Sequence, residues 1–346
     1  MRWVFLGGQG LRAGWSVLAF VLLIEIFNRG VAFALIKLHL VSPNYDFAVP
    51  SVFFELLGGL LALAAAAAVL ARIERRESLL AYNLTGPSRL HNFLSGLATG
   101  FVSLTALVGV LAWGGWLHFG PVTLSGMSLF KFGALWAATF LLVGFNEEGY
   151  FRCFLLFTLT RGINIWWALG LNGAICLALR LTAKGNALWG VYLMALLGIF
   201  PCLWLHLRKI EGAGFWQAAW VTSTLFGFLH VRPGENWFGV FSAAAVGFLC
   251  CVSVRLTGSA WWAIGCHAAW DWAETFFYGT ANSGLVAPGH YLTTTPAGNP
   301  LWSGGAAGPE GSLLVIGAML LWLVVLLVMY RRRKSAAGQC SAEDVR

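Results

Sequence analysis

The chain has 346 residues, of which 59% are hydrophobic and 10% are charged, and its mean hydropathy is +0.75. Soluble domains carry about 25% charged residues, so this composition excludes an ordinary soluble protein and predicts an integral membrane protein. The net charge of +8 does not indicate a nucleic-acid partner, because the basic residues cluster at the ends of apolar segments. Such residues act as cytoplasmic anchors, and the predicted partner is the lipid bilayer.

Ten apolar segments are candidates for crossing a bilayer, which takes about 20 helical residues. They lie at 14–36, 52–71, 92–117, 128–157, 164–181, 187–206, 215–231, 237–255, 259–278 and 311–330. The sequence therefore predicts an all-α fold, a polytopic transmembrane helical bundle of about eight to ten spans. The topology of 164–255 stays open.

The basic residues predict the orientation of the chain. With ten spans and a cytoplasmic N-terminus, the basic groups at 72–76, 208–209 and 331–334 all fall on the cytoplasmic side, as the positive-inside rule prefers. The expected location is the plasma membrane, with both termini cytoplasmic. The chain then divides into N-terminal transmembrane helices at 1–127, a central helical region at 128–278, and a third part at 279–346. This third part holds an external loop, the last span and a basic cytoplasmic tail.

Acidic residues within or near the spans are few enough to consider one by one. They are Glu25, Glu55, Glu147, Glu148, Asp271 and Glu274. A charge at the bilayer centre costs about 2.5–3.5 kcal/mol, so such residues must face one another, a water-filled cavity or a metal. Glu25 and Glu55 lack an obvious partner within the membrane and are weaker candidates for a site. Glu274 follows Asp271 by three residues and lies either in the same cavity or near the outer surface.

Glu147 and Glu148 stand side by side in the segment FNEEGYFRC. On a helix, Glu148 and Arg152 are four residues apart and share a face, so their pairing would lower the cost of burying both. Glu147 points about 100° away around the helix, which leaves its carboxylate free to face a cavity and act as a base. A charge cluster at a helix end is the alternative, but Arg161 marks that end better. The spacing predicts a site and leaves its chemistry open.

Two histidines and another carboxylate follow in later spans. The segment FGFLHVRPGEN places His230 one turn after Phe226, and GCHAAWDW places His267 and Asp271 four residues apart on one helix face. A lone histidine in a span is as often a hydrogen-bonded packing residue, but two histidines with carboxyl groups indicate a cluster. Such a set can build a zinc site with an open position for water or a metal-free base that takes a proton from water. Both routes hydrolyse a carbonyl substrate, and the residues do not decide between them.

In this order, EEGYFR at 147–152, FGFLH at 226–230 and HAAWD at 267–271 resemble the three motifs of the CPBP family. These are intramembrane proteases that include the CaaX prenyl endopeptidases and bacteriocin-processing proteins. The resemblance covers 128–278 and implies a CPBP-like intramembrane protease core there. It further implies an intramembrane (metallo)endopeptidase whose substrate is a membrane-associated peptide or protein, with prenylated proteins among the candidates.

Carried over residue by residue, the resemblance also implies roles for the motif residues. Glu147 resembles the glutamate that activates water in the family. His230 and His267 resemble its two catalytic or metal-binding histidines. Glu148 and Arg152 resemble its supporting pair, which agrees with the shared helix face.

Asp271 stands where many family members carry asparagine. Asparagine can donate a hydrogen bond to a developing oxyanion, whereas an ionised aspartate cannot. Asp271 is therefore expected to be protonated, to bind a metal or to orient His267, and we favour the last two. The expected cofactor is a divalent metal, zinc first, with Glu147, His230, His267 and Asp271 as ligands; a metal-free mechanism is the alternative.

A proton- or ion-coupled membrane transporter, or a non-proteolytic membrane factor with a Glu/His cluster, is the other function considered. Internal symmetry would favour a transporter, and the sequence contains no evident repeat. The predicted spans place His230 near the outer end of its helix, whereas Glu147 lies mid-membrane. Pro233 and Gly234 therefore predict that this helix breaks early or re-enters the membrane.

Overall fold

The structure is a computed structural model that describes residues 5–7, 10–42, 49–182, 185, 187–231 and 236–343. Its helices are α2 (Ala13–Lys37), α3 (Val49–Ile73), α4 (Arg89–Trp113), α5 (Gly126–Glu148), α6 (Leu156–Thr160), α7 (Ile165–Thr182), α8 (Ala187–Leu207), α9 (Ala213–Leu229), α10 (Trp237–Thr257), α11 (Trp261–Trp272), α12 (Pro300–Ser303) and α13 (Val315–Glu343). Two π-helical segments, η2 (Gly149–Leu155) and η3 (Ala273–Phe277), continue α5 and α11. Short 3₁₀ turns form η1 (Leu79–Ala81) and η4 (Pro309–Gly311).

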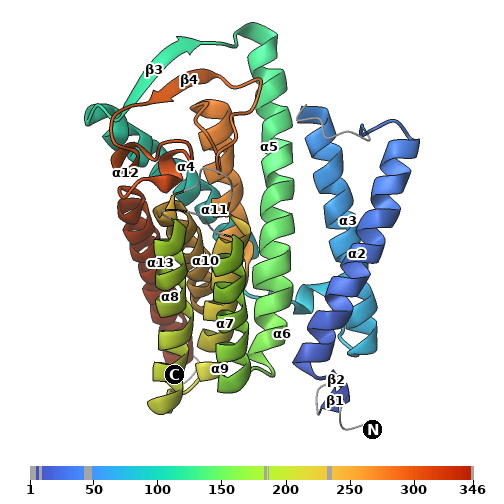
Figure 1. The fold of residues 1–346 in the computed structure, drawn as a ribbon. Helices are drawn as coiled ribbons and strands as arrows, with labels where there is room; N and C mark the ends of the chain where they lie inside the picture. Colours follow the sequence, from blue (N-terminus) through green and yellow to red (C-terminus); the bar gives the residue numbers. More distant parts are fainter. Residues whose placement is uncertain are drawn as a thin grey trace.

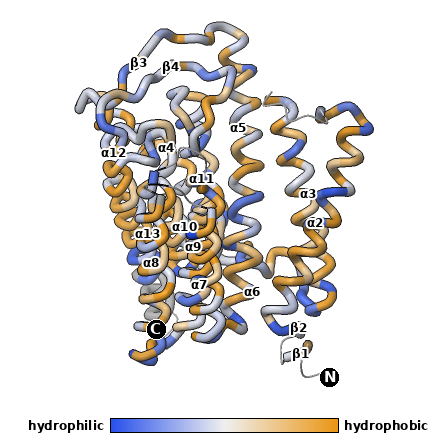
Figure 2. The backbone as a smooth tube through the Cα atoms, viewed as in Figure 1, coloured by the Kyte–Doolittle hydropathy of each residue, from blue (hydrophilic) through white to orange (hydrophobic). Residues whose placement is uncertain are grey.

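The predicted all-α membrane bundle is confirmed. Within the described residues, eight helices are long and apolar enough to cross a membrane, and α5, η2 and α6 together form one of them at Gly126–Thr160. The two other predicted spans, 215–231 and 259–278, correspond to α9 and to α11 with η3, which are shorter. Hydrophobic residues run along the long helices, whereas the loops above them are more hydrophilic (Figure 2).

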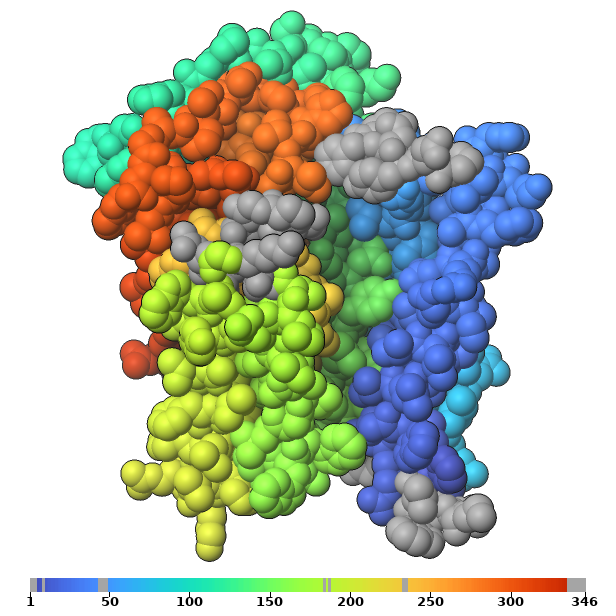
Figure 3. Space-filling model, viewed as in Figure 1, coloured from blue at the N-terminus to red at the C-terminus, as the bar shows by residue number. Residues whose placement is uncertain are grey.

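The helices form two unequal groups beside α5. The pair α2 and α3 stands on one side, and the remaining long helices gather on the other (Figure 1). The face seen in Figure 3 is hollowed between α7 and α2, where α5 is visible at the floor of the recess. The start of α2 and the end of α13 lie at the same end of the bundle (Figure 1). The membrane in which the chain resides and the side that faces the cytoplasm remain predictions.

Backbone-to-backbone packing holds α4 against α11. A methyl group added at Gly96 would lie 2.2 Å from the carbonyl oxygen of Trp262, and one at Gly100 would lie 2.2 Å from that of Cys266. From the other side, a methyl group at Gly265 would lie 2.4 Å from the carbonyl oxygen of Phe93. Small residues permit this close approach of membrane helices. The predicted boundary after residue 127 stays a prediction, but α4 from the first part directly supports α11 from the second.

A small sheet covers the end of the bundle at which α5 begins (Figure 1). Strand β3 (Leu117–Val122) pairs antiparallel with β4 (Leu292–Pro296), so that Leu117 lies opposite Pro296. A second short pair, β1 (Leu6–Gly7) and β2 (Gly10–Leu11), lies before α2. The sequence interpretation placed β4 in the external loop and did not predict either pair. The β3–β4 sheet fixes the loop at 279–314 over the bundle.

Glu74 lies in a turn and takes part in a buried polar cluster. It follows the last residue of α3, and its side chain is buried. Its carboxylate accepts a hydrogen bond from Ser16 Oγ at 2.6 Å and pairs with Arg161 Nη1 at 2.8 Å and Arg76 Nε at 3.3 Å. The result is a polar link between α2, the end of α3 and the end of α6.

Candidate active site

Glu147 and Glu148 end α5, immediately before the π-helical segment η2. Such wide turns are rare in helices and are frequent at functional sites. The predicted pair is present, because Arg152 Nε lies 3.2 Å from Glu148 Oε2, with side-chain exposures of 1% and 0%. A fully buried ion pair of this kind is destabilising unless both members are held in place.

Arg152 is held by aromatic and backbone contacts. Its guanidinium carbon lies 4.5 Å from the ring centre of Phe226 and 5.6 Å from that of Phe151, a cation–π arrangement. Its backbone carbonyl accepts a hydrogen bond from Asn83 Nδ2 at 2.7 Å. Asn83 was missed by the sequence interpretation, because a loop residue distant in the chain gives no local signal of this contact. It helps to fix η2, and with it the position of Glu148.

His267 lies among three carboxylates. Its Nδ1 is 2.9 Å from Glu148 Oε1, whereas its Nε2 is 3.8 Å from Glu147 Oε2 and 3.5 Å from Asp271 Oδ2. A carboxylate only accepts, so the Nδ1 proton is donated to Glu148. In neutral His267, the lone pair on Nε2 would then face the carboxylates of Glu147 and Asp271. A proton, a water molecule or a cation between them would relieve this contact.

Glu148 makes a shorter contact with His267 than Asp271 does. This changes the expectation that Asp271 orients the ring of His267. The atom of His267 that orients the ring is Nδ1, and Glu148 occupies it. Asp271 lies instead on the Nε2 side, four residues along the same helix. Glu148 is therefore the better placed of the two to fix the tautomer of His267.

His230 follows the last residue of α9, which ends at Leu229, close to the predicted end. Its Nδ1 lies 2.8 Å from the carbonyl oxygen of Phe226, so a neutral His230 also carries its proton on Nδ1. The ring of Phe226 lies near both histidines, with centroid distances of 4.4 Å to His230 and 6.3 Å to His267. The distance between the centres of the two histidine rings is therefore at most the sum of these two distances. The predicted break at Pro233 and Gly234 lies outside the described residues.

These groups face one cavity of about 310 Å³. A water molecule occupies about 30 Å³ in the liquid, so the cavity has room for water beside these groups. The acidic residues and histidines that line it are Glu147, His230, His267, Asp271 and Glu310, and apolar walls come from residues that include Val52, Leu56, Trp136, Phe140, Val143 and Val246. The cavity thus brings together the catalytic candidates of three separate motifs, while Glu148 and Arg152 are buried beside it.

The four predicted metal ligands fit a metal site only in part. Both histidines direct Nδ1 to an oxygen, which leaves Nε2 as the ligating atom, as is usual for metal-bound histidine. However, the described part of the chain contains no group of three or more His, Cys, Asp or Glu side chains placed to hold a metal ion. The zinc expectation therefore stays a prediction.

Two weaker candidates lie away from this arrangement. Glu274 is fully buried and accepts a hydrogen bond from Trp270 Nε1 at 3.1 Å, and it is not among the residues that line the cavity. Glu25 does have a partner, contrary to the sequence interpretation, because Arg29 Nη2 lies 2.6 Å from its Oε1. The sequence interpretation overlooked Arg29, although it lies four residues after Glu25 on the same helix.

The fold and the site define a polytopic membrane protein with a polar Glu/His cavity inside its helix bundle. The family model described as type II CAAX prenyl endopeptidase Rce1-like matches residues 202–273, about a fifth of the chain. The match contains His230, His267 and Asp271, and it confirms the resemblance to the CAAX-type intramembrane proteases. No curated protein and no solved structure matches the chain.

Proposed function

We propose that this protein is an intramembrane endopeptidase that uses a water molecule activated by Glu147. The observation that carries the proposal is the meeting of Glu147 Oε2 and His267 Nε2, 3.8 Å apart and from different helices, in an apolar-walled cavity. A single water can bridge groups at this separation, and a general base needs such reach to the proton it removes. The family match to the CAAX prenyl endopeptidases agrees with this chemistry.

Glu147 takes a proton from the bridging water, whose oxygen forms a bond to the substrate carbonyl carbon as the carbonyl π electrons move to oxygen. His230 lines the same cavity but is not one of the two groups that the water bridges. When protonated at Nε2, it donates to the developing oxyanion. Collapse of the tetrahedral intermediate breaks the carbon–nitrogen bond, and the proton held by Glu147 passes to the leaving amine.

Glu148 and Arg152 support this step without touching the substrate. Glu148 Oε1 accepts a hydrogen bond from His267 Nδ1 at 2.9 Å, which fixes the ring so that Nε2 faces Glu147. Arg152 compensates the charge of Glu148 at 3.2 Å. Asp271 lies 3.5 Å from the same Nε2 and stabilises the imidazolium form of His267.

The substrate class follows from the cavity and the family. The apolar walls and the position within the bundle suit a peptide that reaches the site from the membrane. The family's name supplies the candidate: a prenylated C-terminal segment of a membrane-associated protein. We propose this class as the first to assay.

The test is cleavage of a farnesylated CaaX peptide by purified protein in lipid vesicles, with products identified by mass. His230→Ala and His267→Ala are each expected to lower the rate at least about 100-fold, the usual scale for loss of acid–base groups. Glu211→Gln, at an exposed carboxylate, is the control and should retain the wild-type rate. Unfolding midpoints show whether each variant is folded. Full activity of folded His230→Ala would refute the assignment of the site.

A further inference from the structure

The carboxylate of Asp271 needs a fixed direction for the role proposed above. Asp271 is 7% exposed and lies in the cavity wall, where its Oδ2 is 3.5 Å from His267 Nε2. A buried carboxylate is costly unless it is paired and hydrogen-bonded. Stabilisation of the imidazolium form of His267 by Asp271 therefore calls for a donor that holds the carboxylate in place.

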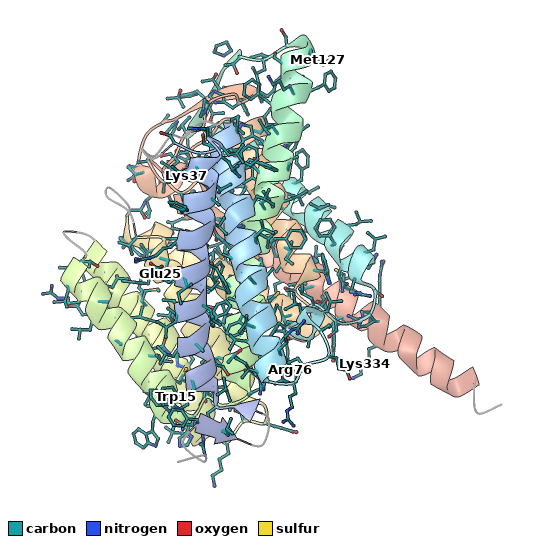
Figure 4. The ribbon with its side chains drawn as sticks, turned by 90° about the vertical axis from the view of Figure 1, so that its right-hand side faces the viewer. Trp15, Glu25, Lys37, Arg76, Met127 and Lys334 are labelled. Carbon is teal, nitrogen blue, oxygen red and sulfur yellow. The ribbon has the colours of Figure 1, made fainter. Side chains whose placement is uncertain are left out.

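Asn282 lies where such a donor is needed. It belongs to the loop at 279–314, which lies at the end of the bundle marked by Met127 and opposite to Arg76 (Figure 4). Asn282 lines the same cavity, and its side-chain amide lies beside the carboxyl group of Asp271. The amide nitrogen Nδ2 is buried and forms no hydrogen bond with any of the described residues. Buried donors without a partner are rare in native structures, and the acceptor next to this one is Asp271.

A tight turn fixes the backbone of Asn282. Its N–H donates to the carbonyl oxygen of Leu285, and Leu285 N–H donates in return to the carbonyl oxygen of Asn282, each at 2.9 Å. Between them, Ser283 and Gly284 have φ angles of 45° and 82°. Positive φ at both central residues is typical of a type I′ turn. A serine rarely adopts such a φ, so contacts from outside the turn are needed to hold it.

Glu310 provides these contacts. Its Oε1 accepts hydrogen bonds from Ser283 N at 2.7 Å and from Ser283 Oγ at 2.8 Å. Gly284 N also donates to the carbonyl oxygen of Ala307 at 3.2 Å. The two arms of the loop are joined by these bonds, which fixes the turn and places Asn282 at the cavity wall.

We propose that Asn282 is a positioning residue whose side-chain amide donates a hydrogen bond to Asp271 and holds its carboxylate against His267. The inference rests on the proposed proteolytic function, in which Asp271 stabilises the imidazolium form of His267. Asn282 acts through Asp271 and not on the attacking water. Its loss therefore slows the reaction without changing how the peptide binds.

The first test compares kcat and KM for the farnesylated CaaX peptide in lipid vesicles. Asn282→Leu keeps the approximate size of the side chain and removes the donor. It should lower kcat about 10- to 100-fold, the scale of a hydrogen bond to a charged group, and leave KM within about twofold. A folded Asn282→Leu protein with the kcat of a cleaving wild type would overturn the proposal.

Val286→Ala is the matched control for the loop. Val286 lies in the same loop, is 61% exposed and is not among the residues that line the cavity. This variant should keep the wild-type kcat. An equal fall of kcat in Val286→Ala and Asn282→Leu would show that any disturbance of the loop slows the reaction, and would contradict a specific role of Asn282.

A double-mutant cycle tests the contact itself and does not depend on cleavage. Unfolding free energies are measured for Asn282→Leu, for Asp271→Leu and for the double variant. Each single substitution removes the same hydrogen bond, so the double variant should be more stable than the sum of the two single changes predicts. Additive changes would show that the two side chains do not interact, and would overturn the proposal.

The two tests separate this inference from the proposed function. Non-additive stabilities in a protein that does not cleave the peptide would confirm the contact between Asn282 and Asp271 and refute the proteolytic function. Cleavage by the wild type together with additive stabilities would leave that function in place and refute the role of Asn282.

Discussion

At the scale of single residues, Glu148 connects the buried charge of Arg152 to His267. One of its oxygens meets His267 Nδ1 at 2.9 Å, and the other meets Arg152 Nε at 3.2 Å. Removing one member of a buried pair leaves an uncompensated charge, which is more costly than replacing the whole pair by apolar groups. Glu148 therefore affects both the stability of the protein and the orientation of the histidine.

This connection predicts different outcomes for single and double substitutions. Glu148→Leu should destabilise the protein by about 3–5 kcal/mol, because Arg152 stays buried without its partner. Adding Arg152→Met should recover a large part of that stability. Cleavage should stay low in both, since His267 loses its orienting carboxylate. Denaturant unfolding and cleavage rates provide the measurements, and a double variant no more stable than Glu148→Leu would contradict the account.

At the scale of elements, α4 determines where α11 holds His267. A side chain at Gly100 has no room, because its first carbon would lie 2.2 Å from the carbonyl oxygen of Cys266, the residue before the histidine. Gly109 on the same helix has no atom within 4 Å of the equivalent position. The two glycines therefore differ in tertiary packing while sharing one helix.

Gly100→Ala is expected to lower stability by about 1–3 kcal/mol, the usual range for overpacking, and to reduce cleavage by displacing α11. Gly109→Ala should leave both almost unchanged. Thermal unfolding in detergent and the cleavage rate compare the two. Equal stability of the two variants would show that the close approach of α4 and α11 is not required.

The sequence predicted the helices, but only some of the contacts that hold the site. All ten apolar segments became helices, because length and hydropathy determine a membrane span locally. The pairing of Glu148 with Arg152 was also predictable, since four residues separate them on one helix. The contacts of Asn83 and Glu74 and the β3–β4 sheet depend on segments far apart in the chain. No local pattern predicts such contacts.

At the scale of the whole molecule, the apolar bundle surrounds a cavity of about 310 Å³ that holds several ionisable groups between apolar walls. Ionisable groups in such a site interact more strongly than they would in water. The requirement for a metal is a property of the whole protein and is open to direct measurement. The zinc prediction expects purified protein to contain zinc, to lose cleavage with a chelator and to regain it when zinc is added. Cleavage by a chelated, metal-free sample would reject zinc and leave Glu147 as the base.

The most direct test of the central claim is the turnover number of Glu147→Gln, measured with the farnesylated CaaX peptide in lipid vesicles. Glutamine keeps the size of the side chain but cannot take a proton from water. The account predicts a fall in kcat of about 100- to 10,000-fold, the range for loss of a general base, with the unfolding midpoint unchanged. A folded Glu147→Gln protein that cleaves at the wild-type rate would contradict it.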